Sequence, residues 1–190
     1  DLHGLRKHDI AYLPQVIEID RSFPICVFDC VAMGLWREIG AWRGLDAREE
    51  QDVARALHTV GLTELADRPV GSLSGGQFQR VLFARLLLQD AAVILLDEPF
   101  RAVDTKTVED LIQLIQRWHG EGRTVLAALH DIEQVRASFP CTLLLAREVV
   151  AWGDTAEVLT HENLAKSRQM AFDSHADVCA RDESLEREAV

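Results

Sequence analysis

Apolar and polar positions alternate in blocks along the chain, and these blocks predict strands separated by helices. Two continuous apolar runs, at residues 91–96 and 123–129, are predicted to be strands buried on both faces, as in a parallel sheet. Shorter runs predict further strands at 10–13, 142–146 and 149–152. Because helical stretches separate most of these runs, the pattern predicts an α/β fold with a doubly wound sheet.

Helical periodicity is clearest in two polar segments. Residues 46–61 place Val53, Leu57 and Val60 on one helix face with charges between them, which predicts a surface helix that ends at Gly61. The second predicted helix, at 105–119, has an apolar stripe made of Val108, Leu111, Ile112, Ile115 and Trp118. With the aromatic stretch before them, residues 16–70 are predicted to form a mainly helical insert.

A glycine pair stands at the start of another predicted helix, which runs to about residue 89. Ser74 and Gln77 have the spacing of a helix capping box. That interpretation leaves Gly75 and Gly76 unexplained, because glycine in a helix costs up to about 1 kcal/mol relative to alanine. Bare N–H groups at the positive end of a helix dipole bind anions, so we expect a phosphate site here.

Polar residues follow three of the predicted strands. Asp97 and Glu98 end the first long apolar run, at the sheet edge where ligands bind in open α/β folds, although an acidic turn is the simpler alternative. Gln15 follows the first strand, and His130 follows the second long run; a lone histidine is more often structural. Asp104 is well placed to cap the helix that begins after it.

Composition narrows the classes of function. The 190 residues are 48% hydrophobic, which suffices for one domain with a core. The net charge of −11 disfavours a basic face that binds nucleic acid or anionic lipid. No apolar run approaches the roughly 18 residues of a membrane span, and the first nine residues are polar, so we expect a soluble chain without a signal peptide.

The cysteines and the tail indicate no metal site. Cys26 and Cys30 are spaced to lie on one helix face rather than at a zinc knuckle. We expect all four cysteines to be free, buried thiols of a reducing cytosol. Residues 166–190 form an acidic tail, in which His175 and Cys179 are expected to be solvated rather than metal-binding.

The phosphate-cradling sequence G-x-x-x-x-G-K-[ST] is absent from the chain. Lysine occurs only at Lys7, Lys106 and Lys166, and none of the three follows a glycine. We expect an N-terminally truncated product of a longer gene, which has no ATPase activity alone. The alternative is a natural docking module that uses the P-loop of another subunit.

The motifs and their order resemble those of ATP-binding cassette (ABC) ATPases. LSGGQ followed by QR resembles the ABC signature, and VILLDEP resembles the Walker B motif with its catalytic glutamate. The resemblance implies a P-loop NTPase-like parallel sheet core, incomplete here, with a mainly helical signature subdomain. It divides the chain into core residues 1–15, a helical subdomain at 16–90, core residues 91–165 and the tail at 166–190.

The resemblance also implies a role for each motif residue. Asp97 would hold the Mg²⁺ of ATP through water, and Glu98 would polarise the attacking water. Asp104 resembles the D-loop aspartate that acts across a dimer interface. His130 resembles the switch histidine that contacts the γ-phosphate. Gln15 resembles the Q-loop glutamine that senses Mg²⁺ and links the site to the membrane partner.

The family pairs two ATPase subunits head to tail. Each signature loop then holds the γ-phosphate of ATP bound to the other subunit; here that loop is Ser74, Gly75, Gly76 and Gln77. The helical insert would dock a membrane permease through the apolar side chains Phe23, Phe28, Trp36 and Trp42. This implies a cytoplasmic protein, peripheral on the inner face of the membrane.

Three segments look like those of subunits that energise zinc, manganese or iron importers. They are SFPI at 22–25, FQRVLFARLLLQD at 78–90 and DEPF at 97–100. In such systems an extracytoplasmic receptor and the permease select the ion, so the receptor is an indirect partner. The alternatives are an ABC ATPase for another transported substrate and a non-transport ABC ATPase acting on nucleic acid. A nucleic-acid ATPase of this kind would be expected to have long coiled-coil heptads or a basic surface, and this sequence has neither.

Overall fold

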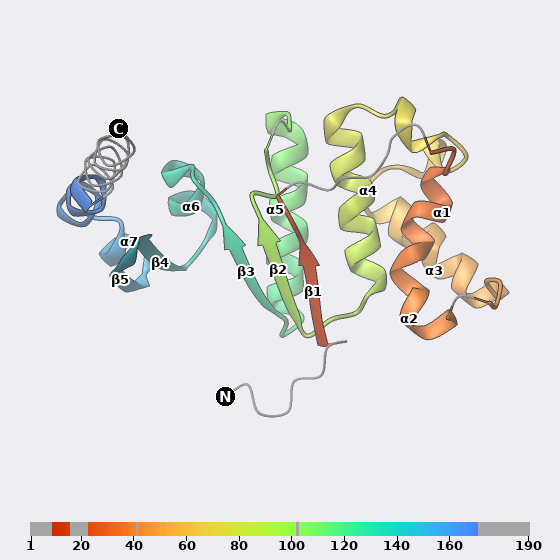
Figure 1. The fold of residues 1–190 in the computed structure, drawn as a ribbon, viewed down its shortest axis with the longest axis horizontal. Helices are drawn as coiled ribbons and strands as arrows, with labels where there is room; N and C mark the ends of the chain where they lie inside the picture. The colour runs from red at the N-terminus through yellow and green to blue at the C-terminus, as the bar shows by residue number, and fades with distance from the viewer. Residues whose placement is uncertain (1–8, 16–22, 41, 102, 171–190) are drawn as a thin grey trace, which may run out of the picture. The chain divides into compact units, whose positions relative to one another are not determined.

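The computed structural model describes residues 9–15, 23–40, 42–101 and 103–170 (Figure 1). The chain divides into two compact units, Asp1–Leu129 and His130–Val190. Within the described residues, no helix is long and apolar enough to cross a membrane.

The first unit contains a three-stranded parallel sheet. Its strands are β1 (Ile10–Leu13), β2 (Val93–Asp97) and β3 (Thr124–Ala128), in the order β1-β2-β3. The predicted strand at 10–13 is confirmed, whereas β2 and β3 begin slightly later than the apolar runs that predicted them. Leu13 pairs with Leu96, and Leu96 pairs with Ala127, so the three strands end at one edge of the sheet.

Among the described residues, only one face of this sheet is well covered, and the expectation that the strands at 91–96 and 123–129 are buried on both faces is wrong. Ala11 and Ile94 lie on the covered face and are at most 1% exposed. On the other face, Tyr12 is 55% exposed and Leu126 is 57% exposed. The apolar runs are continuous, but the described elements of this unit pack mainly against one side of the strands.

Two helices cover the buried face. They are α4 (Gly75–Leu88), which contacts β1, and α5 (Thr105–Gly120), which contacts β3 and α4. In Figure 1, α5 runs behind the strands and α4 lies beside β1. The rings of Phe83 and Trp118 stack between the two helices, with centroids 5.8 Å apart and planes 6° from parallel.

A helical group packs against the other side of α4. It comprises α1 (Val27–Ala32), the 3-10 turn η2 (Met33–Leu35), α2 (Trp36–Ile39) and α3 (Ala47–Thr59), followed by the turns η3 (Thr63–Leu65) and η4 (Val70–Ser72). The predicted surface helix is confirmed in α3: Val53, Leu57 and Val60 are buried. Gly61 follows it with a φ of 69°, the left-handed conformation that glycine adopts readily.

The second unit contains an antiparallel hairpin between two helices. Its elements are α6 (Ile132–Ser138), β4 (Cys141–Ala146), β5 (Glu148–Asp154), α7 (Thr155–Val158) and a helix at 161–170. The expectation that these strands extend a doubly wound sheet is wrong. Only Arg147, with a φ of 64°, joins β4 to β5, and a parallel crossover needs a dozen or more residues.

The cysteines only partly match the expectation of buried thiols. Cys30 is buried and Cys26 is half-buried, but Cys141 is exposed because it begins β4 on the open face of the hairpin. These three are free thiols. Cys179 and His175 lie outside the described residues. Burial raises the pKa of the Cys30 thiol, which keeps it protonated at neutral pH.

Candidate functional site

The predicted capping box at the start of α4 is confirmed. The Gln77 N–H donates to Ser74 Oγ at 3.2 Å, and the Ser74 N–H donates to Gln77 Oε1 at 3.0 Å. The first four N–H groups of a helix, here those of Ser74 to Gln77, have no partner within the helix, and this box satisfies two of them. Gly75 and Gly76 therefore present bare N–H groups at the positive end of a 14-residue helix.

Gly76 also has a packing role that the sequence did not indicate. A Cβ at this position would lie 3.0 Å from Asp104 Oδ2 and 3.5 Å from Thr107 Oγ1. Those atoms belong to α5 and its N-cap, which are nearly thirty residues further along the chain. The glycine thus allows the Asp104 carboxylate to approach the first turn of α4.

Asp104 is the N-cap of α5, as its position predicts. Its Oδ1 accepts the Thr107 N–H at 3.0 Å, and its Oδ2 accepts the Thr107 hydroxyl at 2.7 Å. These two hydrogen bonds, with a smaller contribution from the charge of Arg80, hold the pKa of the Asp104 carboxyl below its usual value. Asp104 therefore remains a fixed anion beside the signature loop.

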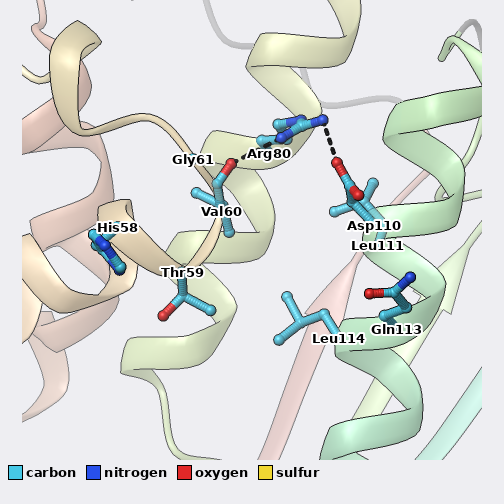
Figure 2. Close-up of a pocket in the computed structure, with 9 residues that line it drawn as sticks. All are labelled: His58, Thr59, Val60, Gly61, Arg80, Asp110, Leu111, Gln113 and Leu114. Atoms are coloured by element: carbon cyan, nitrogen blue, oxygen red, sulfur yellow. Dashed lines mark hydrogen bonds and ion pairs between the residues drawn. The ribbon is translucent and has the colours of Figure 1, made fainter.

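Arg80 joins three elements, and the sequence indicates no role for it beyond its place in the QR pair that follows LSGGQ. Its guanidinium donates to the Val60 carbonyl at 3.1 Å, to Thr107 Oγ1 at 3.1 Å and to Asp110 Oδ2 at 2.7 Å. Figure 2 shows the side chain reaching from α4 to the end of α3 and to α5, at the rim of a cavity of about 300 Å³. The signal that could have indicated it is a basic residue in a helix with many apolar positions, although Arg85 is a second such residue in α4.

Asp97 and Glu98 lie at the carboxyl end of β2. Glu98 has a φ of 45°, a left-handed conformation that is uncommon outside glycine, and its N–H donates to the Ala128 carbonyl at 3.0 Å. Its carboxylate lies 4.0 Å from the Arg101 guanidinium. The half-buried Asp97 carboxylate has no hydrogen bond or ion pair within the part of the chain that the structure describes.

One hydrogen bond joins the turn that follows Asp97 and Glu98 to helix α4. Gln79 Nε2 donates to the carbonyl of Pro99 at 2.7 Å, and Pro99 is among the fully buried residues. Gln79 lies in the second turn of α4, two residues after Gln77. The Glu98–Pro99 turn and the signature loop are therefore held to the same helix.

The other two predicted site residues lie near strand ends. Gln15 is exposed and follows β1 at the same sheet edge as Asp97, because Leu13 pairs with Leu96 in the parallel register. His130 is exposed and is the first residue of the second unit. Its place beside Glu98 stays a prediction.

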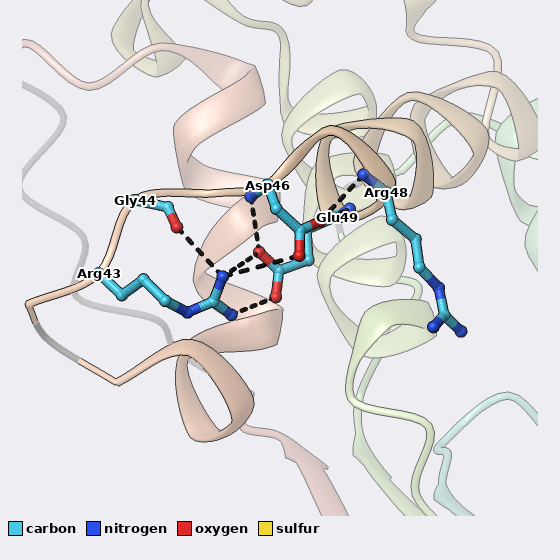
Figure 3. A network of polar contacts seen from close by, with 5 residues as sticks. All are labelled: Arg43, Gly44, Asp46, Arg48 and Glu49. Atoms are coloured by element: carbon cyan, nitrogen blue, oxygen red, sulfur yellow. Dashed lines mark hydrogen bonds and ion pairs between the residues drawn. The ribbon is translucent and has the colours of Figure 1, made fainter.

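A separate polar network fixes the start of α3 (Figure 3). The Arg43 guanidinium binds both carboxylate oxygens of Glu49 and lies 3.7 Å from Asp46, while Asp46 and Glu49 form a capping box. These hydrogen bonds hold the pKa of both carboxyls below their usual values. Trp42, next to this network, is fully exposed.

The residues present fit a magnesium nucleotide in part. The bare N–H groups of Gly75 and Gly76 suit a phosphate oxygen, and the unpartnered Asp97 carboxylate suits a hard cation. No group of three or more His, Cys, Asp or Glu side chains that could hold a metal occurs among the described residues. A cation here would need further ligands from water or phosphate oxygens, which is usual for Mg²⁺.

Comparison with known proteins identifies the class to which this arrangement belongs. Residues 3–101 match the family described as ABC transporter. The chain therefore belongs to the ABC transporter family, and its fold is that of ABC ATPase domains.

Individual relatives are proteins of metal transport systems. The chain is 42% identical over 155 residues to the manganese transport system ATP-binding protein MntA of Synechocystis sp., covering 82% of this chain and 60% of that protein. It is 37% identical over 161 residues to the zinc transport system ATP-binding protein TroB of Treponema pallidum, covering 85% and 60%.

A solved structure agrees with these relatives. An ABC transporter described as of the metal-chelate type, in an inward-facing conformation, superposes with a TM-score of 0.74 at 34% identity, covering 82% of this chain and 61% of that chain. The chain thus spans about three fifths of the length of the relatives named here.

Proposed function

We propose that the chain is part of an ATP-binding and ATP-hydrolysing subunit that energises an ABC importer of divalent metal ions, either manganese or zinc. One observation carries the nucleotide part of this proposal. The bare first turn of α4 lies against the Asp104 carboxylate, and the same helix holds the Glu98–Pro99 turn through Gln79. The metal part rests on the names of the relatives.

In this proposal the signature loop contacts nucleotide held by a second subunit. The N–H groups of Gly75 and Gly76 and the Ser74 hydroxyl would bind γ-phosphate oxygens, with Gln77 fixing the geometry of Ser74. The two subunits would pair head to tail, with Asp104 at the interface. Because ATP would bind the paired state preferentially, ATP would favour pairing, and its hydrolysis would let the two subunits separate.

The carboxylates would then act on the nucleotide bound to their own subunit. Asp97 would hold Mg²⁺ through water and Gln15 would lie close to it, while Glu98 would orient the attacking water and His130 would contact the γ-phosphate. Bound Mg²⁺ supplies positive charge that offsets the charge developing on the phosphate oxygens. The left-handed backbone at Glu98 would aim its carboxylate away from the strand direction.

The helical group would face the membrane permease. Phe23, Trp36 and Trp42 are 61%, 52% and 100% exposed, and Phe28 is half-buried. Exposed aromatic side chains on an otherwise charged surface favour a partner with apolar side chains. The proposal places the subunit on the cytoplasmic face of the membrane, with an extracytoplasmic receptor as an indirect partner.

The division of the chain belongs to the same proposal. Segments 1–15 and 91–165 would form the ATPase core around a helical subdomain at 16–90, with a tail at 166–190. The boundary between the two compact units, at residues 129 and 130, falls inside the second core segment. A nucleic-acid ATPase is disfavoured by the net charge of −11 and by a longest described helix of only 16 residues.

The substitution Glu98→Gln in the complete subunit tests the role of Glu98. The amide keeps the shape of the side chain but loses the charge that polarises water, so we expect nucleotide binding to persist and turnover to stop. Titration with a fluorescent ATP analogue and phosphate release measure the two steps. Glu109→Gln, on the exposed surface of α5, is the matched control. Turnover of Glu98→Gln close to that of the control would contradict the assignment.

A further inference from the structure

Thr107 is a buried polar residue to which the proposed function gives no role. It lies in the first turn of α5 and is 5% exposed. Its hydroxyl donates to Asp104 Oδ2 at 2.7 Å and accepts from Arg80 Nη2 at 3.1 Å. Its N–H also donates to Asp104 Oδ1 at 3.0 Å, so both carboxylate oxygens are held by this one residue.

The position of Asp104 matters because of what lies beside it. A Cβ on Gly76 would be 3.0 Å from Asp104 Oδ2, so this oxygen nearly touches the first turn of α4. Arg80 belongs to the same helix as Gly76, one turn further on. The Thr107 hydroxyl therefore connects two positions of α4: it accepts a hydrogen bond from Arg80 and donates one to Asp104, whose Oδ2 lies close to Gly76.

We infer that Thr107 is a positioning residue whose hydroxyl fixes the Asp104 carboxylate against the signature loop. The loop before α5 and the first turn of α4 then move together, because Arg80 and Asp104 are joined through one buried hydroxyl. The consequence for nucleotide contact rests on the proposed function, whereas the positioning itself requires no nucleotide. The ion pair of Arg80 with Asp110 would join α4 to α5 without Thr107, but it does not reach Asp104.

Two substitutions separate the hydroxyl from the shape of the side chain. Thr107→Val keeps the branched shape and the backbone N–H but removes the hydroxyl. Thr107→Ser keeps the hydroxyl and loses a methyl group. Circular dichroism and a cooperative urea transition establish that each variant folds before it is used.

A double-mutant cycle on the 190-residue chain tests the positioning. Gly76→Ala is introduced into the wild type, Thr107→Val and Thr107→Ser, and the shift in the urea midpoint is measured in each. With the Thr107 hydroxyl present, the methyl group that Gly76→Ala introduces would lie against an Asp104 carboxylate that is held in place by its hydrogen bond. We expect Gly76→Ala to shift the midpoint less unfavourably in Thr107→Val than in the wild type, and equally in Thr107→Ser and the wild type.

Gly44→Ala is the control, because a Cβ there has no atom within 4 Å. Its shift should be the same in all three backgrounds. Equal shifts of Gly76→Ala in the wild type and Thr107→Val would overturn the inference. So would a reduced shift in Thr107→Ser, because the hydroxyl would then not be the link.

Steady-state kinetics of the complete subunit test the consequence for catalysis. We expect Thr107→Val to lower kcat by about tenfold or more with a smaller change in KM, because displaced groups weaken the transition state most. Thr107→Ser should retain the wild-type kcat. A wild-type kcat in Thr107→Val would overturn the catalytic consequence. If the wild-type subunit hydrolyses no ATP, the proposed function fails while the double-mutant cycle still decides the positioning.

Discussion

At the residue scale, the signature loop combines a local cap with a distant contact. Ser74 and Gln77 close the capping box within one helical turn. Gly76 instead lies close to Asp104, the N-cap of α5. The signature loop, Ser74 to Gln77, thus both begins the helix and contributes to the proposed phosphate site. Substitutions at Ser74 separate these two roles.

Ser74→Ala and Ser74→Asp are expected to differ in stability but to share a loss of nucleotide contact. Alanine removes the cap and lowers the free energy of unfolding by about 1 kcal/mol, whereas aspartate is as good a cap as serine. Aspartate also places a negative charge where phosphate would bind. Urea denaturation measures stability, and ATP-dependent pairing of the complete subunit measures contact. Unimpaired pairing by Ser74→Asp would argue against a phosphate at this loop.

The Asp104 carboxyl gives the chain a predictable response to acid. Its pKa is lowered in the folded state, so its stabilising effect is fully present above the unfolded pKa of about 3.9 and is lost as the pH falls through the folded pKa. Asp104→Asn removes this titration. We expect the difference in urea midpoint between wild type and Asp104→Asn to shrink between about pH 6 and about pH 3. A constant difference across this range would contradict the assignment.

The sequence predicts the local contacts of these residues but not the distant ones. The caps at Ser74 and Asp104 depend on neighbours within three positions, so spacing alone indicates them. Arg80 meets Val60 and Asp110 across 20 and 30 positions, and only the packing of three helices brings them together. The sequence does not predict the role of Thr107 for the same reason, because its contact with Arg80 also spans distant positions.

At the element scale, α4 is the centre of the first unit. The helical group packs on one side of it, and β1 and α5 pack on the other. The sequence predicts this helix and its bounds well, because its cap and apolar run are local. It does not predict which faces of the strands are covered: a continuous apolar run looks the same whether one or both faces are buried, as Leu126 shows.

Gly34→Ala tests the packing of the helical group on α4. A Cβ on Gly34 would lie 2.5 Å from the Arg85 carbonyl oxygen and 2.9 Å from Leu88 Cβ, so the backbones must move apart. We expect a loss of about 1–3 kcal/mol in the free energy of unfolding. Gly44→Ala should change it by less than about 0.5 kcal/mol. Similar urea midpoints for the two variants would show that η2 does not pack closely on α4.

At the scale of the whole molecule, this chain holds only part of the proposed site. The proposed site uses Ser74 to Gln77, the carboxylates Asp97 and Glu98, and Asp104, but the chain contains no G-x-x-x-x-G-K-[ST] sequence. In P-loop NTPases the loop with this sequence and its lysine hold the β- and γ-phosphates. Without it, the N–H groups of α4 and the Asp97 carboxylate have too few contacts to hold a nucleotide in line for attack.

The 190-residue chain is therefore expected to hydrolyse no ATP by itself. Phosphate release by the purified chain should match that of Asp97→Asn, because any activity common to both comes from a contaminant rather than from this site. Asp97-dependent hydrolysis by the chain alone would show that its residues form a sufficient active site and would refute the proposed division of the site.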